Sequence, residues 1–129
     1  MTCGHTRKLY IQSNILAKYR VLPPYPREGK KRPQHNRITY INDISTSENV
    51  IKHITKCAEG KSTMVILDSD HSRDHVLSEL EKYSGFVTKG NYLIVEDTNI
   101  NPLMPDGTML EGPYATVKDF IKVHSEYCR

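Results

Sequence analysis

Two apolar runs in the chain each end abruptly in carboxylates. Asp68 and Asp70 close the first run, and Glu96 and Asp97 close the second. If the two runs are neighbouring parallel strands, all four acids emerge at the same carboxyl edge, where open α/β sheets bind their ligands. Unit charges about 4 Å apart repel by roughly 4 kcal/mol at an effective dielectric near 20, so the cluster is expected to bind a cation.

Three short segments are predicted to form the strands of this sheet. Residues 64–67 and 92–95 are continuous apolar runs too short for a helix, as expected of strands covered on both faces. Residues 37–41, with the sequence RITYI, are β-branched and aromatic and favour a strand that runs into polar Asn42 and Asp43. All three strands therefore end in polar or acidic residues.

The segments between and after these strands carry helical signals. Ser45 and Glu48 fit a capping box at the start of an amphipathic helix that Gly60 ends. Ser72 can cap a second helix, and Pro113 suits the first position of a third. The resulting order β-α-β-α-β-α implies parallel strands joined by helical crossovers and predicts an α/β fold.

The N-terminal part is predicted to be less regular. A loose helical spacing of apolar residues over 6–22 predicts a helix without a clear cap. Prolines then open a basic stretch at 27–37, which could contact phosphates. Because only Tyr25 offers a stacking surface for bases, we interpret the stretch as a solvated linker and expect no nucleic-acid partner. Residues 1–35 are therefore expected to form a variable segment with a basic, proline-rich linker.

Composition limits the class of protein. With 129 residues and a net charge of +3, the chain fits one small domain. Its mean hydropathy is −0.56, and no apolar run approaches the about 20 residues that span a bilayer. Its start lacks the apolar core of a signal peptide, so we expect a cytoplasmic protein with no membrane span. Cys3, Cys57 and Cys128 match neither a zinc site nor a disulfide framework, which favours reduced thiols.

The acid-tipped strands carry a family resemblance. Residues 65–72 (VILDSDHS) and 92–99 (YLIVEDTN), with the helix opened by Gly112 and Pro113, resemble the cephalosporin hydroxylase and rhamnosyl O-methyltransferase family. Members of that family are S-adenosylmethionine-dependent methyltransferases with a Rossmann-like fold, and their metal site is similar to that of catechol-type O-methyltransferases. The resemblance implies a partial methyltransferase-like domain over residues 36–129.

A metal site follows from this resemblance. It implies that Asp68, Glu96 and Asp97 are ligands of a divalent cation, and carboxylate oxygens suit Mg²⁺. The metal would chelate two substrate oxygens and lower the pKa of one, which creates an oxyanion aimed at the methyl group of S-adenosylmethionine. Holding nucleophile and methyl donor in line can supply roughly 7 to 11 kcal/mol of the barrier. The implied activity is O-methylation of a hydroxyl group on a glycan or another small molecule.

Three further residues receive roles from the same resemblance. Asp70 would face the amino-acid part of the cofactor, and Asp43 matches the region near the adenine. His71 lies where catechol-type enzymes carry their general base, so it would take the hydroxyl proton. Plainer alternatives stay open, because Asp70 could cap the helix that starts near Ser72 and His71 could face solvent in a loop. His75 is expected to be a surface residue.

Two other enzyme classes share the local pattern. A strand ending in Asp-x-Asp also begins haloacid-dehalogenase-type phosphatases, in which Asp68 would be the phosphoryl nucleophile. That class requires a cap domain between the two acidic strands, and the helix predicted over 72–83 leaves no room for one. A glycosyltransferase Asp-x-Asp motif that holds a nucleotide-sugar metal is the third possibility, but it does not account for Glu96 and Asp97.

The chain departs from the family upstream of residue 36. No Gly-x-Gly sequence is present to cradle the cofactor, and the residues before 36 resemble neither of the family's first two strands. The family's last strands, after the helix that ends near Tyr127, are also missing. We therefore expect a partial Rossmann-like fold whose unpaired strand edges could support a homo-oligomer. The chain would be a truncated or inactive methyltransferase, or a non-catalytic remnant that acts as a binding or scaffold protein. Activity would require that the N-terminal segment or a second chain replaces the lost strand.

Overall fold

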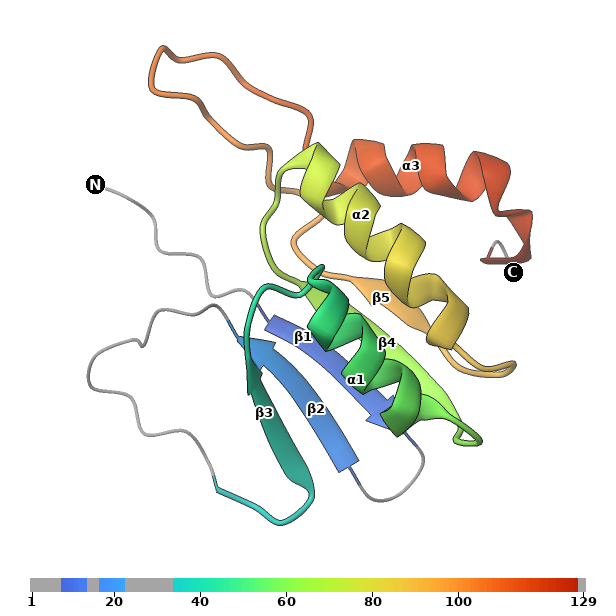
Figure 1. The fold of residues 1–129 in the computed structure, drawn as a ribbon. Helices are drawn as coiled ribbons and strands as arrows, with labels where there is room; N and C mark the ends of the chain where they lie inside the picture. Colours follow the sequence, from blue (N-terminus) through green and yellow to red (C-terminus); the bar gives the residue numbers. More distant parts are fainter. Residues whose placement is uncertain (1–7, 14–16, 23–33, 128–129) are drawn as a thin grey trace.

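One mixed β-sheet with helices packed against it forms the fold (Figure 1). The computed structural model describes residues 8–13, 17–22 and 34–127. In chain order, the elements are β1 (Lys8–Ser13), β2 (Ala17–Leu22), β3 (Ile38–Asn42), α1 (Glu48–Ala58), β4 (Thr63–Asp68), α2 (Arg73–Tyr83), the 3-10 helix η1 (Ser84–Phe86), β5 (Leu93–Val95), α3 (Pro113–Val123) and the 3-10 helix η2 (Ser125–Tyr127). Within the described ranges, no helix is long and apolar enough to cross a membrane.

The sheet has the strand order β3-β2-β1-β4-β5. β2 pairs in parallel with β3, and β4 pairs in parallel with β5, whereas β1 is antiparallel to both of its neighbours. Helices α1 and α2 form the crossovers from β3 to β4 and from β4 to β5. The predicted α/β fold with parallel strands and helical crossovers is therefore confirmed, and it is consistent with a partial Rossmann-like domain.

The helix predicted over 6–22 is wrong, because the described part of that segment forms β1 and β2. Apolar residues alternate in β1 with a period of two, at Leu9 and Ile11, and this spacing also fits a loose helical pattern. The register pairs these two positions with Leu67 and Val65, which are the buried apolar positions of β4. The apolar positions of β1 thus lie in the same rows of the sheet as those of β4, and this match specifies the register.

β1 and β2 occupy the places between β3 and β4 where unpaired edges were expected. The N-terminal part of the chain therefore supplies the neighbours of both strands, while the domain division after residue 35 stays a prediction. Because β1 runs against β4, its first residue, Lys8, lies opposite Asp68 in the register. The carboxyl end of β4 is thus flanked by the amino end of β1. Residues 23–33, which hold much of the expected basic linker, lie outside the described residues.

Helix α1 begins two residues later than the predicted capping box. Its N-cap is Ser47, whose Oγ accepts a hydrogen bond from the Val50 amide at 3.3 Å, so the predicted cap at Ser45 is wrong. Asp43 accounts for the shift, because its Oδ2 accepts a hydrogen bond from Ser47 Oγ at 3.1 Å and orients that hydroxyl. Ser45 is buried instead, and its hydroxyl is available for contacts with another element.

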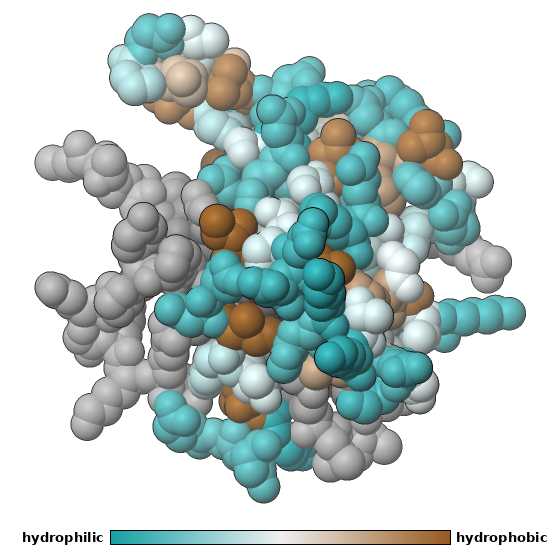
Figure 2. Space-filling model, in the orientation of Figure 1, coloured by the Kyte–Doolittle hydropathy of each residue, from teal (hydrophilic) through white to brown (hydrophobic). Residues whose placement is uncertain are grey.

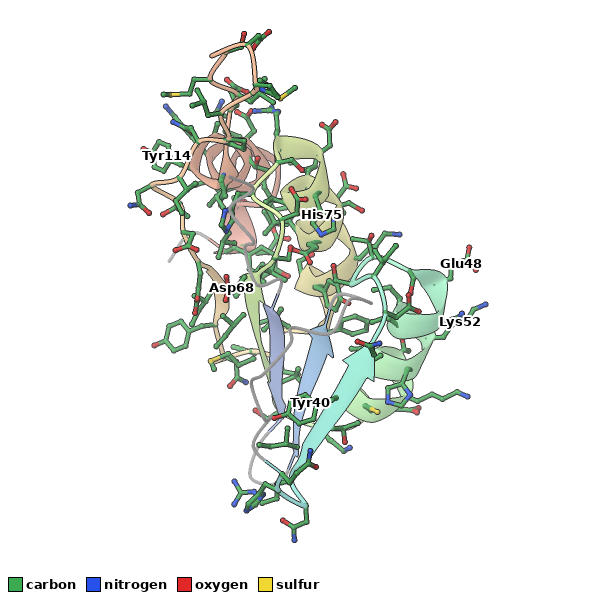
Figure 3. All side chains as sticks on the ribbon, turned by 90° about the vertical axis from the view of Figure 1, so that its left-hand side faces the viewer. Tyr40, Glu48, Lys52, Asp68, His75 and Tyr114 are labelled. Carbon is green, nitrogen blue, oxygen red and sulfur yellow. The ribbon has the colours of Figure 1, made fainter. Side chains whose placement is uncertain are left out.

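The core lies between the helices and one face of the sheet. Its buried apolar residues are Val50, Ile54, Val65, Leu67, Val76, Leu80, Tyr83 and Phe120. Val65 and Leu67 lie on the same face of β4, because side chains alternate along a strand. Buried residues of α1, α2 and α3 pack with these two in one cluster. The opposite side of α1 carries the charged residues Glu48 and Lys52, which point away from the sheet (Figure 3). This division between apolar and charged sides explains why α1 lies flat on the sheet.

The residue before α3 must be glycine. Helix α3 starts at Pro113, as predicted, and Gly112 is its N-cap. A Cβ atom on Gly112 would overlap the carbonyl oxygen of Ile100, so no other residue fits without moving the backbone. The Gly112 amide also donates to Oδ1 of Asn101 at 3.2 Å. These contacts close the base of the loop that precedes α3.

That loop, residues 101–111, projects from the body of the protein as a hairpin (Figure 1). A β-bridge between Leu103 and Met109 joins its two arms. Brown apolar surface is visible on the projection in Figure 2. The exposed apolar side chains of the hairpin are Leu103, Met104, Met109 and Leu110. The hairpin therefore presents apolar surface beside the carboxyl edge of the sheet.

We expect Ile54→Ala to lower the free energy of unfolding by about 2–5 kcal/mol, because its fully buried side chain fills the space between α1 and the sheet. The matched control is Ile44→Ala, because the Ile44 side chain is 49% exposed and its loss should cost about 0.5 kcal/mol or less. Urea unfolding followed by circular dichroism measures both changes. Equal losses for the two variants would contradict the core described above.

Candidate functional site

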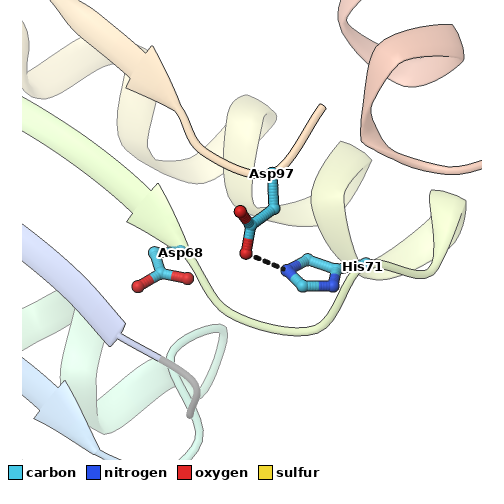
Figure 4. A group of neighbouring side chains, drawn as sticks. All are labelled: Asp68, His71 and Asp97. Carbon is cyan, nitrogen blue, oxygen red and sulfur yellow. Dashed lines mark ion pairs between the residues drawn. The ribbon is translucent and has the colours of Figure 1, made fainter. Parts of the chain in front are cut away.

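Three side chains that could bind a cation meet at the carboxyl edge of the sheet (Figure 4). Asp68 is the last residue of β4, His71 lies in the turn before α2, and Asp97 comes two residues after β5. One ligand atom from each residue lies within 4.8 Å of the other two. The predicted meeting of Asp68 and Asp97 at one edge is therefore observed, because their strands pair in parallel. Their role as metal ligands stays a prediction.

His71 is buried, so the alternative of a solvent-facing loop residue is wrong. Its Nε2 lies 3.3 Å from Oδ2 of Asp97. As an N–H, Nε2 can point at this carboxylate, and in the other neutral tautomer the same nitrogen can bind a metal. The predicted role as general base is not tested by this geometry, which places the Asp97 carboxylate 3.3 Å from one ring nitrogen.

Asp97 adopts a left-handed backbone conformation, with a φ of 53°. It is the one non-glycine residue with a positive φ in the described ranges. Such a conformation costs on the order of 1–3 kcal/mol, although aspartate tolerates it better than most residues. The bend takes the chain out of the strand, and the Asp97 carboxylate lies between Asp68 and His71 (Figure 4). Backbone strain at the residue that completes the group is a feature of functional sites.

Glu96 lies on the same edge but does not belong to the group within 4.8 Å. Its backbone amide donates to the carbonyl of Leu67 at 2.9 Å, so Glu96 continues the pairing of β5 beside the end of β4. His71, which was predicted to act on the substrate proton, is the third member of the group instead. Ligation by Glu96 stays a prediction.

The two predicted cofactor residues each accept local hydrogen bonds. Oδ1 of Asp70 accepts a hydrogen bond from the Ser72 amide at 2.9 Å. Asp70 therefore supports the start of α2, as expected from the alternative in which it caps this helix. Oδ1 of Asp43 accepts from the Ile44 amide at 2.7 Å, and its Oδ2 accepts from Ser47 Oγ at 3.1 Å. Both residues lie at the carboxyl ends of strands, and their contact with a cofactor stays a prediction.

Sequence reasoning missed a polar row on α2. Glu79 is buried, and His75, which was expected on the surface, is partly buried with its Nε2 3.3 Å from Oε1 of Glu79. The sequence did contain a signal for this buried polar row, because Glu79 falls among the core positions Val76 and Leu80. A charged residue at such a position needs a polar partner. Burial and the nearby Glu79 carboxylate raise the pKa of Tyr83 well above its usual range, so its hydroxyl remains a hydrogen-bond donor.

An open groove of about 610 Å³, within the size range of ligand sites, is lined by residues of the segment that follows Asp97. It extends from Thr98, the residue after Asp97, to Tyr114 in the first turn of α3. Tyr114 is 63% exposed and points away from α3 toward solvent (Figure 3). The residues that line the groove are Thr98, Asn99, Asn101, Met109, Leu110, Glu111, Tyr114 and Ala115. Apolar walls with amide and hydroxyl groups suit a small polar ligand with an apolar face.

Arg73 joins the start of α2 to the rim of this groove. Its guanidinium lies 2.5 Å from a carboxylate oxygen of Glu111 at the base of the hairpin and 2.6 Å from Oδ2 of Asp119 in α3. Asp119 also pairs with Lys122 at 2.7 Å. Hydrogen bonds from Lys122 and Arg73 lower the pKa of Asp119 to about 2. We call these ion pairs among Arg73, Glu111, Asp119 and Lys122 the clamp. The clamp connects the start of α2, which follows the turn that carries His71, to the groove.

Comparison with known proteins identifies relatives. The family model described as rhamnosyl O-methyltransferase/CmcI matches residues 19–129. Proteins named rhamnosyl O-methyltransferase in Mycobacterium tuberculosis and Mycobacterium bovis are 34% identical over 88 residues, which cover 64% of this chain and 35% of each relative. The protein of that name in Mycobacterium leprae is 35% identical over 88 residues, which cover 64% of this chain and 37% of the relative. The chain thus spans about a third of the length of the curated relatives it matches. No solved structure matches it significantly.

The clamp around Asp119 predicts a pH dependence of stability. Because the pKa of Asp119 is lower in the folded protein than its ordinary value of 3.8, its contribution is present above that value and is lost as the pH falls toward about 2. We expect Asp119→Asn to be less stable than the parent protein near neutral pH, and this difference to shrink as the pH falls from about 4 to 2. Urea midpoints across this range measure it. A difference that does not change with pH would contradict the ion pairs described.

Proposed function

Because the chain belongs to the rhamnosyl O-methyltransferase/CmcI family, we propose that it carries the metal-binding half of an S-adenosylmethionine-dependent O-methyltransferase site. The acceptor would be a sugar hydroxyl, in keeping with the name of its relatives. One observation carries the proposal, namely the convergence of Asp68, His71 and Asp97 within 4.8 Å. We also propose that β1 and β2 take the places of the first two strands of the complete methyltransferase fold.

The donor set fits a divalent cation. The carboxylates of Asp68 and Asp97 suit Mg²⁺ or Mn²⁺, and His71 adds an imidazole, which suits transition metals such as Zn²⁺. Asp68 and Asp97 would hold the metal, with Glu96 on the same edge as a further carboxylate. When bound, the metal supplies Lewis-acid chemistry that lowers the pKa of a coordinated hydroxyl group.

His71 would direct its Nε2–H at Asp97 and take the proton of the acceptor hydroxyl at Nδ1. Oδ2 of Asp97, 3.3 Å from Nε2, would stabilise the imidazolium that forms. Because His71 is buried, the proton is held away from bulk water. Removal of the proton makes the acceptor oxygen a nucleophile suited to methyl transfer.

Asp70 and Asp43 would bind the cofactor from the turns after β4 and β3. Hydrogen bonds from the Ser72 amide and from Ser47 Oγ already hold these carboxylates in place, so less ordering is required when a ligand binds. The edge beside β4 is formed by the amino end of β1, at Lys8, and not by a glycine-rich turn after a strand. Cofactor affinity would therefore depend on the two acidic turns.

The groove next to Asp97 would hold the acceptor. The apolar face of a pyranose ring can pack on an exposed aromatic ring, and Tyr114 provides one at the far end of the groove. Hydroxyl groups of the sugar can pair with Thr98 and Asn99, which follow Asp97 directly. The hydroxyl to be methylated would then point toward Asp97 and His71.

Metal binding is the first test. We expect the parent protein to bind Mg²⁺ or Mn²⁺ in calorimetric titrations, and Asp68→Asn and Asp97→Asn each to weaken binding at least about tenfold, because each removes a charged oxygen ligand. Asparagine also tolerates the positive φ at position 97, so this change isolates the charge. The control is Asp106→Asn, a carboxylate in the projecting hairpin, which should bind like the parent protein.

The same titrations separate the two roles of His71. If His71 is only the base, His71→Ala keeps its affinity for the metal and loses activity; if His71 is a ligand, it loses both. Calorimetry with S-adenosylmethionine in the presence of Mg²⁺ then separates an enzyme from a non-catalytic remnant. Folded protein that gives no heat at millimolar S-adenosylmethionine would support the remnant and contradict the methyltransferase proposal. Turnover of an aryl phosphate that Asp68→Asn abolishes would instead identify the phosphatase alternative.

Acceptor binding is the second test. We expect Tyr114→Ala to weaken binding of methyl α-rhamnopyranoside roughly 2- to 10-fold, which corresponds to the about 0.5–1.5 kcal/mol that aromatic packing contributes. The matched control is Tyr92→Ala, because Tyr92 is 70% exposed but precedes β5, outside the groove. Saturation-transfer NMR titrations compare the two. Equal weakening by both variants, or by neither, would contradict the placement of the acceptor.

A further inference from the structure

Three polar side chains recur at every fourth residue of α2 and so share one face of the helix. They are His75, Glu79 and Tyr83 (Figure 3 labels His75). Glu79 is only 1% exposed, and Tyr83 is fully buried. A row of polar groups on the face that packs toward the sheet costs desolvation energy, so its contacts require an explanation.

The row reaches both turns that carry the predicted cofactor residues. In the turn after β4, Ser69 Oγ donates to Oε2 of Glu79 at 2.6 Å. In the turn after β3, Tyr83 OH donates to the carbonyl oxygen of Ser45 at 2.5 Å. His75 Nε2 shares a hydrogen bond of 3.2 Å with Ser45 Oγ and lies 3.3 Å from Oε1 of Glu79, an oxygen with no hydrogen-bond partner in the described part of the chain, so His75 lies between the two turns.

The first of these contacts lies inside the candidate site. Ser69 is the residue between Asp68 and Asp70, and His71 follows two positions later. Ser69 is itself buried, so its hydrogen bond to Glu79 is shielded from water. A fixed Ser69 limits the backbone freedom of both neighbouring acids. The order of the metal-binding turn is therefore coupled to a side chain on α2.

A gain in stability does not account for a buried carboxylate at this position. Replacing a buried ion pair or triad as a whole with apolar residues of similar size is often neutral or stabilising, so burial of a charge is weak evidence for a gain in stability. Nor does the arrangement form a Ser-His-acid relay, because Ser45 and Glu79 both approach the same nitrogen of His75, whereas a relay uses the two ring nitrogens separately. The arrangement therefore does not support a nucleophilic role for Ser45.

We propose that Glu79 is a positioning residue that holds the turn of Asp68 and Asp70 through Ser69, and that His75 extends this hold to the turn after β3. The proposal rests on the function proposed above, in which these turns bind metal and cofactor. Groups that orient the ligands of a metal typically change its affinity 10- to 100-fold when they are removed. Glu79 acts on such ligands indirectly and touches no reacting atom.

The test is Glu79→Leu, with Glu81→Leu, an exposed glutamate of the same helix, as the matched control. We expect Glu79→Leu to be less stable than the parent protein, because the buried Ser69 hydroxyl loses its acceptor, and to exchange the backbone amides of residues 69–72 at least about tenfold faster than this loss of stability alone accounts for. Its affinity for Mn²⁺ should fall by about 10- to 100-fold. Glu79→Gln keeps an oxygen that accepts from Ser69 and should restore slow exchange and most of the affinity. The control should match the parent protein in all three measurements.

Each result has one meaning. If Glu79→Leu keeps slow exchange at residues 69–72, the positioning role is wrong, whatever the metal affinity. If the parent protein binds no Mn²⁺, the proposed function fails, and the exchange rates still decide the role of Glu79. If Glu79→Leu does not fold, Ser69→Ala breaks the same hydrogen bond from the other side. Fast exchange in Ser69→Ala would then support the proposal, and unchanged exchange would overturn it.

Discussion

The parallel pairing of β4 with β5 places Leu67 opposite Val95 and brings two strand ends to one edge of the sheet. Asp68 follows one strand directly, and the left-handed residue Asp97 turns the chain after the other. A slip of one residue in this register would move every side chain of the strand to the opposite face. His71 would then lose the carboxylate beside its Nε2. The groove depends on the same register, because it begins at the residue after Asp97.

Apolar contacts bury α2 against the sheet, and polar contacts fix its position there. Val76 and Leu80 bury the helix on the sheet, but apolar contacts are not directional and leave its exact rotation and height loosely specified. Directional bonds from the first turn and the middle of the helix supply that precision. Arg73 fixes its first turn to the hairpin and α3, while Glu79 fixes its middle to the turn after β4. The cost of dehydrating these charges is offset by a defined geometry at the edge of the sheet.

Local sequence patterns predicted most of the fold and the meeting of Asp68 and Asp97 at the candidate site. Short apolar runs bounded by caps and turn residues located three strands and three helices, and parallel crossovers implied that Asp68 and Asp97 share an edge. Residues 6–22 were mistaken for a helix, because a short apolar pattern fits both periods until a distant partner strand selects one. The burial of His71 and the partners of Glu79 depend on tertiary contacts across many residues, and the pattern of the sequence near each residue does not contain them.

The reversed direction of β1 determines where the polypeptide enters the sheet. Since Lys8 lies opposite Asp68, β1 begins at the same edge as the candidate metal group, whereas the described C-terminal residues lie beyond the far end of α3 (Figure 1). A peptide joined directly to Lys8 would therefore be tethered beside that group, at an effective concentration that reaches millimolar for a short flexible linker. A polyhistidine tag placed there would compete for the very cation under study. The same tag attached after η2 would be held away from it.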